Sequence, residues 1–178
     1  MQKSSLAIFS YTYYNYVGDM MFREMLRKKQ KISDDECIIL LKNEKRGVLS
    51  VIGDGGYPYG FPINHYYNEN DGCLYFHCGK TGHKLDAIKD CNKASFCVYD
   101  KGYKKENDWA LNIKSVIVFG KIEIVNDMDT IVDISRKLSY KFTTDESYID
   151  NEIKRFAKAT LLLKLKPEHI SGKLVNES

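Results

Sequence analysis

The residues whose types and spacing best suit ligand binding lie where a β-rich segment is followed by a helical one. Leu74–Cys78 predicts a strand, glycines at 79 and 82 predict a turn, and residues 82 to 89 predict a short helix. The first turn of a helix carries partial positive charge and free N–H groups, so acidic side chains are favoured there. This helix begins instead with His83 and Lys84, which add positive charge where it is already positive.

An external anion at this helix start would relieve the repulsion. Backbone N–H groups and Lys84 would hold it, with His83 as a second candidate, and the two glycines would let the backbone approach a phosphate closely. The alternative is a solvated Lys84 that binds nothing, because an exposed charge at a helix end costs only ~0.3–1 kcal/mol. The residue pattern by itself leaves both interpretations open.

The cysteines and histidines do not form a recognisable metal or hydrolase motif. Successive side chains of a strand point to opposite faces, so His77 and Cys78 cannot both reach one ion without distortion. The chain has no C-x-x-C pair and no G-x-S-x-G, P-loop or G-x-G-x-x-G motif. We therefore predict no metal site, and we interpret the cysteines as small buried hydrophobic residues.

Composition limits the class of protein. The 178 residues fit one domain, and 27 basic against 24 acidic residues give a net charge of +3, too balanced to indicate a nucleic-acid partner. Five cysteines and an apolar run at residues 6–9, shorter than the roughly 7–15 residues of a signal-peptide core, favour reduced thiols in the cytoplasm. No stretch approaches the ~20 apolar residues of a membrane span. Residues 1–20 predict a poorly ordered tail, and residues 21–178 a single domain.

The elements that must position the chemistry follow from apolar periodicity. A capping box starts a helix at Ser33, and further helices are expected at 82–89 and around Ile131–Leu138 and Ile149–Phe156. Pro62 places its strand at an edge or a bulge, and Pro167 is expected to end the last strand. The six predicted strands cover residues 47–52, 59–67, 73–78, 94–99, 115–125 and 160–166. Short connections between them predict an α+β fold whose six-stranded antiparallel sheet closes, or nearly closes, into a small barrel with flanking helices.

An ordered set of motifs then resembles a known family. After a basic opening (Met21–Arg23 and Arg27–Lys29) come Gly47–Ser50, Gly56–Asn64, Leu74–Cys78, Gly82–Lys84, Ser95–Val98 and Ser115–Lys121. Together they resemble the pyridoxamine 5'-phosphate oxidase-like flavin split barrels, and among these the nitroimidazole-resistance (Nim) branch. The resemblance covers about residues 21–173.

The resemblance implies FMN bound at the interface of a homodimer of six-stranded split barrels. Residue by residue, it implies that Pro62, Ile63 and Asn64 line the isoalloxazine. His77 and Cys78 would lie beside the flavin, His83 and Lys84 would hold the phosphate, and Ser115 and Val116 would contact the flavin from the central strand. This chain departs from the pattern of the true oxidases in two places. Those enzymes have Arg-Lys at the phosphate, where this chain has His83-Lys84, and a tryptophan-bearing signature near the C-terminus, which is not visible after Pro167. These departures put vitamin B6 oxidation in doubt and favour the Nim-like branch.

The resulting expectation is an FMN-dependent oxidoreductase that reduces a small flat acceptor such as a nitroimidazole or a quinone. His77, as the catalytic residue, would donate a proton or orient the substrate, because histidine titrates near neutral pH. A flavin-binding module without turnover, a pyridoxamine 5'-phosphate oxidase and a haem-handling relative are the alternatives. Asn64 as a turn residue and His77 as an ordinary strand histidine remain open as well.

Overall fold

The computed structural model describes residues 22–177, so the predicted tail at 1–20 lies outside the described residues. The helices are α2 (Asp34–Asn43), α3 (His83–Asp90), α4 (Met128–Ser139) and α5 (Glu146–Phe156), with short 3₁₀ turns η1 (Lys28–Gln30), η2 (Asp54–Gly56) and η3 (Ala157–Ala159). The strands are β1 (Arg46–Ile52), β2 (Pro58–Asn64), β3 (Tyr66–Asn68), β4 (Cys73–Gly79), β5 (Lys93–Tyr99), β6 (Tyr103–Lys104), β7 (Leu111–Val125) and β8 (Thr160–Asn176). None of the described helices has the length and apolar character needed to cross a membrane.

The capping box predicted at Ser33 is present. The Glu36 backbone N–H donates to Ser33 Oγ over 3.2 Å, and the Ser33 N–H donates to the Glu36 carboxylate over 3.1 Å. At the starts of α4 and α5 the side chains of Asp127 and Asp145 each accept one backbone N–H, without the reciprocal bond of a capping box. Each cap satisfies a backbone donor that the helix itself leaves free, so these starts are fixed by local sequence.

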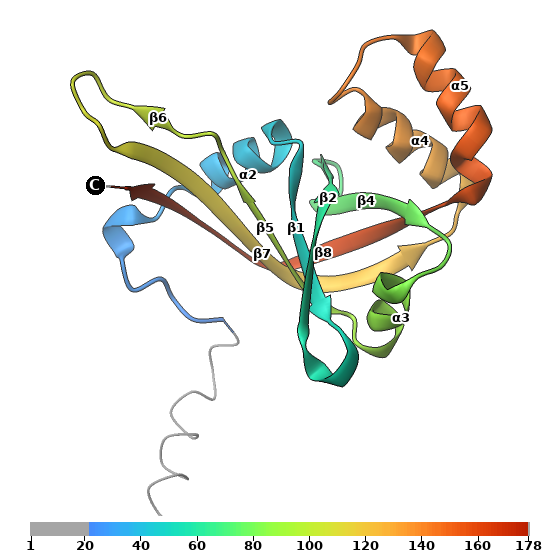
Figure 1. Cartoon of the computed structure of the whole chain (residues 1–178), viewed down its shortest axis with the longest axis horizontal. Coiled ribbons are helices and arrows are strands. Elements are labelled where there is room, and N and C mark those ends of the chain that lie inside the picture. Colours follow the sequence, from blue (N-terminus) through green and yellow to red (C-terminus); the bar gives the residue numbers. More distant parts are fainter. Residues whose placement is uncertain (1–21, 178) are drawn as a thin grey trace, which may run out of the picture.

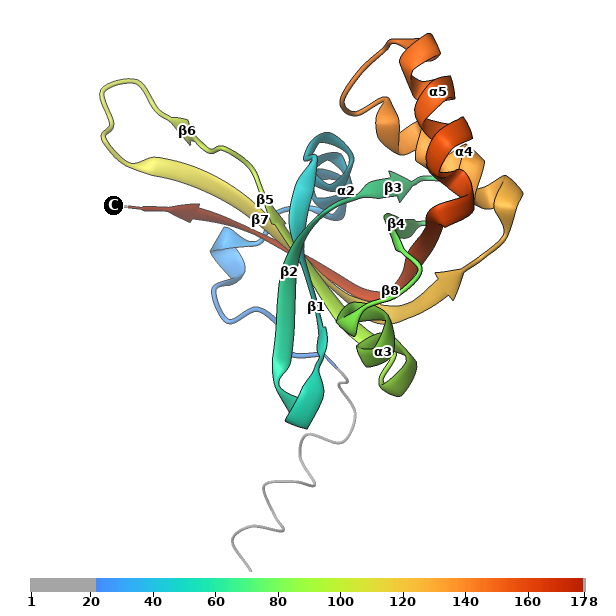
Figure 2. The ribbon, with the colours of Figure 1, turned by 45° about the vertical axis from the view of Figure 1, so that its right-hand side comes forward.

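The strands form one antiparallel sheet in the order β2-β1-β5-β7-β8-β4-β3, with β6 paired to β7. β2 and β3 occupy opposite edges although only His65 separates them in sequence. The segment Pro58–Asn68 therefore pairs with β1 at its start and with β4 at its end, and curls the sheet into a split barrel (Figure 2). The predicted α+β class is confirmed. Residues 22–177 form eight strands where six were expected, because the predicted strand at 59–67 divides at His65 and the two-residue β6 forms beside β7.

The prediction that Pro167 ends the last strand is wrong. β8 continues to Asn176 through a bulge in its pairing with β7, where Gly120 faces Pro167 and Phe119 faces His169. A bulge tolerates proline, because the ladder there does not need the missing N–H donor. β7 is also longer than expected and begins at Leu111 rather than Ser115.

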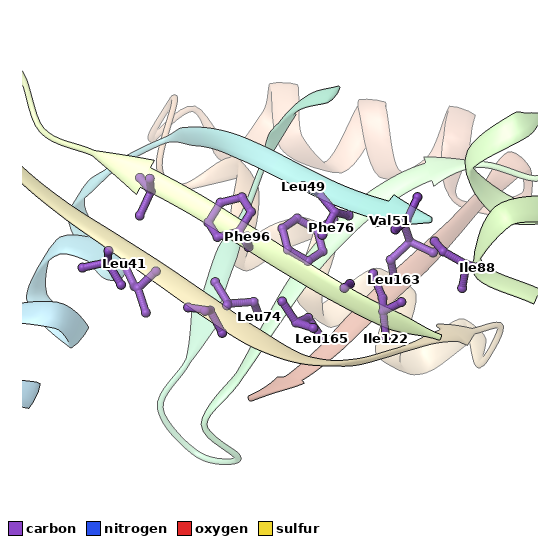
Figure 3. Packing of buried hydrophobic residues seen from close by; sticks show 14 of the residues in the cluster. Leu41, Leu49, Val51, Leu74, Phe76, Ile88, Phe96, Ile122, Leu163 and Leu165 are labelled. Carbon is purple, nitrogen blue, oxygen red and sulfur yellow. The ribbon is translucent and has the colours of Figure 1, made fainter. Parts of the chain in front are cut away.

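The core fills the barrel interior. Inward side chains from five strands meet there, among them Leu49, Phe76, Phe96, Ile122 and Leu163 (Figure 3). A smaller cluster lies under α4 and joins Ile131 and Ile134 to Cys73, Tyr75 and Leu162. β4 is thus buried on both faces for most of its length, and its last residues emerge beside α4 and α5.

His65 sits at the point where β2 passes into β3 and is fully buried. Its Nε2–H donates to the Leu41 carbonyl over 2.8 Å, its Nδ1 has no hydrogen-bond partner within residues 22–177, and its ring packs against Phe96 at 4.7 Å. Burial lowers the pKa of His65 to about 3, and the nearby Lys141 ammonium contributes in the same direction. The imidazole is therefore neutral in the folded protein at physiological pH.

We expect acid to destabilise the protein through His65. In the unfolded chain this histidine binds a proton below pH 6.5, whereas the folded state resists protonation until about pH 3, so stability falls as pH drops through that window. Between pH 7 and pH 5 this group should remove about 2 kcal/mol from the free energy of unfolding. Urea titrations at both pH values measure it, with His65→Gln as the comparison, because a neutral amide can still donate to Leu41. An equal pH dependence in both proteins would contradict the assignment.

Candidate functional site

The start of α3 lies against the inner side chains of β2. The His83 ring stacks on Tyr59 with centroids 4.4 Å apart and planes 17° apart, and Lys84 Nζ lies 4.9 Å from the centre of the Phe61 ring. Figure 1 shows α3 between the β1–β2 hairpin and the end of β4. The two predicted phosphate-binding residues are therefore brought next to β2. Sequence reasoning missed Tyr59 and Phe61 because alternation assigns them to the core.

The turn that leads into α3 leaves room for a ligand. Gly82 has a φ of +127°, and no side chain caps the helix that follows it. A Cβ built at Gly79 or at Gly82 would have no heavy atom within 4 Å. Asp54 Oδ1 lies 3.4 Å from His83 Nε2, but its side chain is 93% exposed and can rotate away. Open space, an uncapped helix start and a lysine are the features that a binding site for an anion requires.

The three predicted contacts on β2 do not point the same way. Pro62 and Asn64 lie on the outer face of the sheet, whereas the Ile63 side chain packs against the barrel core. Asn64 Oδ1 accepts a hydrogen bond from Arg46 Nε over 3.0 Å, which fixes the amide on that outer face. Ile63 can therefore contact a ligand outside the barrel only through its backbone.

His77 and Cys78 project from β4 in opposite directions, as strand alternation requires. Cys78 is buried in the barrel, and burial raises the pKa of its thiol. His77 is partly exposed at the mouth of a cavity, where burial lowers its pKa and the charge of Lys84 lowers it further. His77 is therefore neutral at pH 7, with one nitrogen as donor and the other as acceptor.

The cavity beside His77 has a volume of about 320 Å³, within the range of small-ligand sites. It lies between the end of β4 and the α4–α5 pair. Its walls are mostly apolar, and its polar groups come from the helices and the start of β8: Ser135, Ser139, Tyr148, Glu152 and Thr160. Sequence reasoning missed this cavity, because the apolar stripes of both helices predict only core packing and nothing in their spacing shows that they pack beside His77.

Ser115 and Val116 stand apart from the other predicted residues. Val116 is fully buried in the core, so its side chain cannot contact an external ligand. Ser115 lies on the outer face of β7, paired with Tyr99 and Lys173. Three strand spacings separate β2 from β7, about 14 Å along the sheet. One chain therefore places His83 and Lys84 against the inner face of β2. Pro62, Asn64 and Ser115 lie instead on the outer face of the sheet.

Solved structures share this architecture at low sequence identity. A Bacteroides thetaiotaomicron protein assigned to 5-nitroimidazole antibiotic resistance is 21% identical with a TM-score of 0.69, covering 82% of this chain and 87% of its own. An FAD-binding protein from Mesorhizobium loti is 22% identical with a TM-score of 0.59, covering 82% and 97%. An FAD- and haem-binding protein from Mycobacterium smegmatis is 22% identical with a TM-score of 0.64, covering 82% and 73%. At these identities, the likeness establishes the fold.

The sequence comparison goes further than the fold. No curated protein is significantly similar to the chain. The family model for pyridoxamine 5'-phosphate oxidase matches residues 33–174, from the capping box of α2 almost to the end of β8. This match covers most of the chain and confirms the resemblance drawn from the motifs. The chain belongs to the pyridoxamine 5'-phosphate oxidase family.

Proposed function

We propose that the protein binds FMN in the split between β2 and β4 and uses it to reduce a small flat acceptor. The observation that carries the proposal is the start of α3, where an uncapped helix, open glycines and Lys84 lie together and could hold one phosphate. The fold relatives that bind FAD support a flavin in this architecture. FMN is favoured over FAD because the site offers a single phosphate position.

The residues present fit FMN in size as well as in charge. The phosphate position lies beside Tyr59, and the outward Asn64 is five residues further along β2, about 16 Å in extended chain. Because Tyr59 faces inward and Asn64 outward, FMN that contacts both would cross the edge of the sheet at β2. Lys84 would neutralise the phosphate, and Pro62 and Asn64 would border the ring on the outer face of β2.

Bound FMN supplies the electron transfer, and the protein supplies binding, orientation and exclusion of water. His77 is neutral and holds one N–H at the cavity mouth, where it can donate a hydrogen bond or a proton to an acceptor. The apolar walls from α4 and α5 would select a flat, weakly polar molecule. A nitro-heterocycle or a quinone meets these requirements, and the fold relative assigned to 5-nitroimidazole resistance is consistent with them.

A second copy of the chain would complete the site. The outer face of the sheet carries a continuous row of partly exposed side chains, Val48 beside Cys97 beside Ile117, with Ser115 in the neighbouring row. Val48 is 40% exposed and Ile117 is 39% exposed, which is unusual for an apolar row in the middle of a sheet. We propose that a twofold-related copy covers this face and contributes Ser115 to the flavin of its partner.

The experiment is an anaerobic turnover assay. We expect the purified protein to be yellow, the heat-released cofactor to have the mass of FMN, and NADH or NADPH to be oxidised as a 5-nitroimidazole is reduced. His77→Ala should lower turnover by about 10²-fold or more while flavin content stays unchanged. A colourless protein that also fails to bind added FMN would overturn the cofactor proposal. Bound FMN without turnover would leave a flavin-binding module, and a haem spectrum would indicate the haem-handling alternative.

Lys84→Ala should weaken FMN binding by about 1.5–3 kcal/mol, the range for a hydrogen bond to a charged group. Lys89→Ala is the matched control, because Lys89 lies in the last turn of the same helix and pairs with Asp86 over 3.2 Å. Quenching of flavin fluorescence during titration gives both dissociation constants. Equal affinities of the two variants would show that the start of α3 does not bind the phosphate.

A further inference from the structure

The segment before α2 is fixed to the sheet at both of its ends. At the C-terminal end of this segment, the Ile32 N–H donates to the Gly172 carbonyl over 3.1 Å, and Lys31 forms a β-bridge with Lys173. At its N-terminal end, the centroids of the Phe22 and His169 rings lie 4.9 Å apart and the ring planes are 10° apart.

The segment and β8 together line an open hollow of about 560 Å³, larger than the cavity beside His77 and within the range of small-ligand sites. Phe22, Met25 and Ile170 give it apolar walls, and His169 and Ser171 contribute polar groups from β8. The hollow shares no lining residue with the His77 cavity. It is therefore a separate site on the molecule.

The aromatic wall of the hollow is held in place. Phe22 is stacked on His169 and also lies 5.6 Å from the ring of Phe119, which projects from β7. Rings in such offset stacks are attractive beyond the area they bury. A planar ligand could extend this stack without reordering the chain.

The charge around the hollow is positive. Arg23, Lys28 and Lys31 line it against one acid, Glu24, which is paired with Lys28 over 3.1 Å. Within residues 22–177, neither Arg23 nor Lys31 takes part in an ion pair. An anion bound in the hollow would therefore meet a lining of net positive charge.

We propose that this hollow binds a planar aromatic anion. Its ring would lie against Phe22, and its carboxylate, sulfonate or phosphate would lie between Arg23 and Lys31. The alternative is that the basic side chains of this segment are solvated and bind no ligand. Arg27 and Lys29 add further positive charge nearby. The proposal uses none of the residues assigned to the flavin, but the hollow borders the face that the proposed second copy covers, because Ser171 pairs with Ile117 and Lys173 with Ser115.

The test uses the full chain saturated with FMN, and 2-naphthoate as the probe, with the uncharged 2-naphthalenemethanol as its isostere. We expect saturable binding of naphthoate by calorimetry, shifts of the His169 ring signals in NMR spectra, and binding of the isostere at least about tenfold weaker. Arg23→Gln with Lys31→Gln should weaken naphthoate binding at least about tenfold. Arg27→Gln with Lys29→Gln removes the same charge from the same segment, but neither residue lines the hollow, so its affinity should stay within about twofold of wild type.

Phe22→Leu separates the ring contact from the charge. It keeps an apolar side chain, and we expect it to weaken naphthoate binding while leaving flavin content unchanged. Equal losses of naphthoate affinity in the two double charge variants would show that binding depends only on the net charge of the segment, and this would overturn the proposal. Absence of binding, or displacement of FMN by naphthoate, would overturn it as well, the latter by placing the probe in the flavin site.

Discussion

Gly120→Ala should destabilise the fold by about 3 kcal/mol or more, at the severe end of single substitutions. A Cβ at this position would overlap the carbonyl oxygen of Lys166 and lie 2.9 Å from its carbonyl carbon. Both atoms belong to the backbone of β8 at the point where the bulge brings Pro167 opposite Gly120. A side chain could rotate out of the way, but here the two central strands would have to separate.

Urea unfolding without added flavin measures this loss, with Gly79→Ala as the control. Gly79 also lies in a strand, its φ is not in the left-handed region, and a Cβ there would meet nothing within 4 Å. We expect Gly79→Ala to change stability by less than about 1 kcal/mol, because alanine mainly reduces the entropy of the unfolded chain. Similar midpoints for both variants would show that β7 and β8 do not approach as closely as the bulge requires.

The same bulge shows a limit of sequence reasoning. A proline after a β-rich run normally indicates the end of a strand, because it has no N–H to donate. Pro167 does not end β8, because Gly120 on β7 accepts the irregular pairing. The partners are far apart in sequence, and no local pattern links them. The strands and helices themselves were predictable, since the alternation in β5 and the capping box of α2 are local properties.

The candidate site was predictable to the same extent. His83 and Lys84 follow a strand and a glycine turn within a few residues, so their position at a helix start could be inferred directly. The cavity at His77 could not, because its walls come from α4 and α5, which pack beside β4 only through the tertiary fold. Ile63 and Val116 were named through the family resemblance, and their inward side chains now restrict any flavin contact to the backbone.

Ser115 raises a different question, because its place in the site depends on a second copy. If each flavin takes Lys84 from one protomer and Ser115 from the other, two defective variants should restore activity to each other. Lys84→Ala weakens the phosphate position in both sites of its own dimer. Ser115→Trp places a bulky side chain on the outer face of β7 and would block both flavin sites of its own dimer. Each homodimer is then impaired at every site.

Mixing the two variants under conditions that exchange protomers should recover flavin binding. Half of the dimers become mixed, and each mixed dimer has one site with both residues native, so about a quarter of the sites should bind FMN with wild-type affinity. Fluorescence titration after mixing measures this fraction, and light scattering reports the mass of the particle. Each variant exchanged with itself is the control and should stay impaired. If mixing restores nothing although protomers exchange, Lys84 and Ser115 do not serve the same flavin across the interface, and a monomeric mass with full flavin occupancy would place the whole site within one chain.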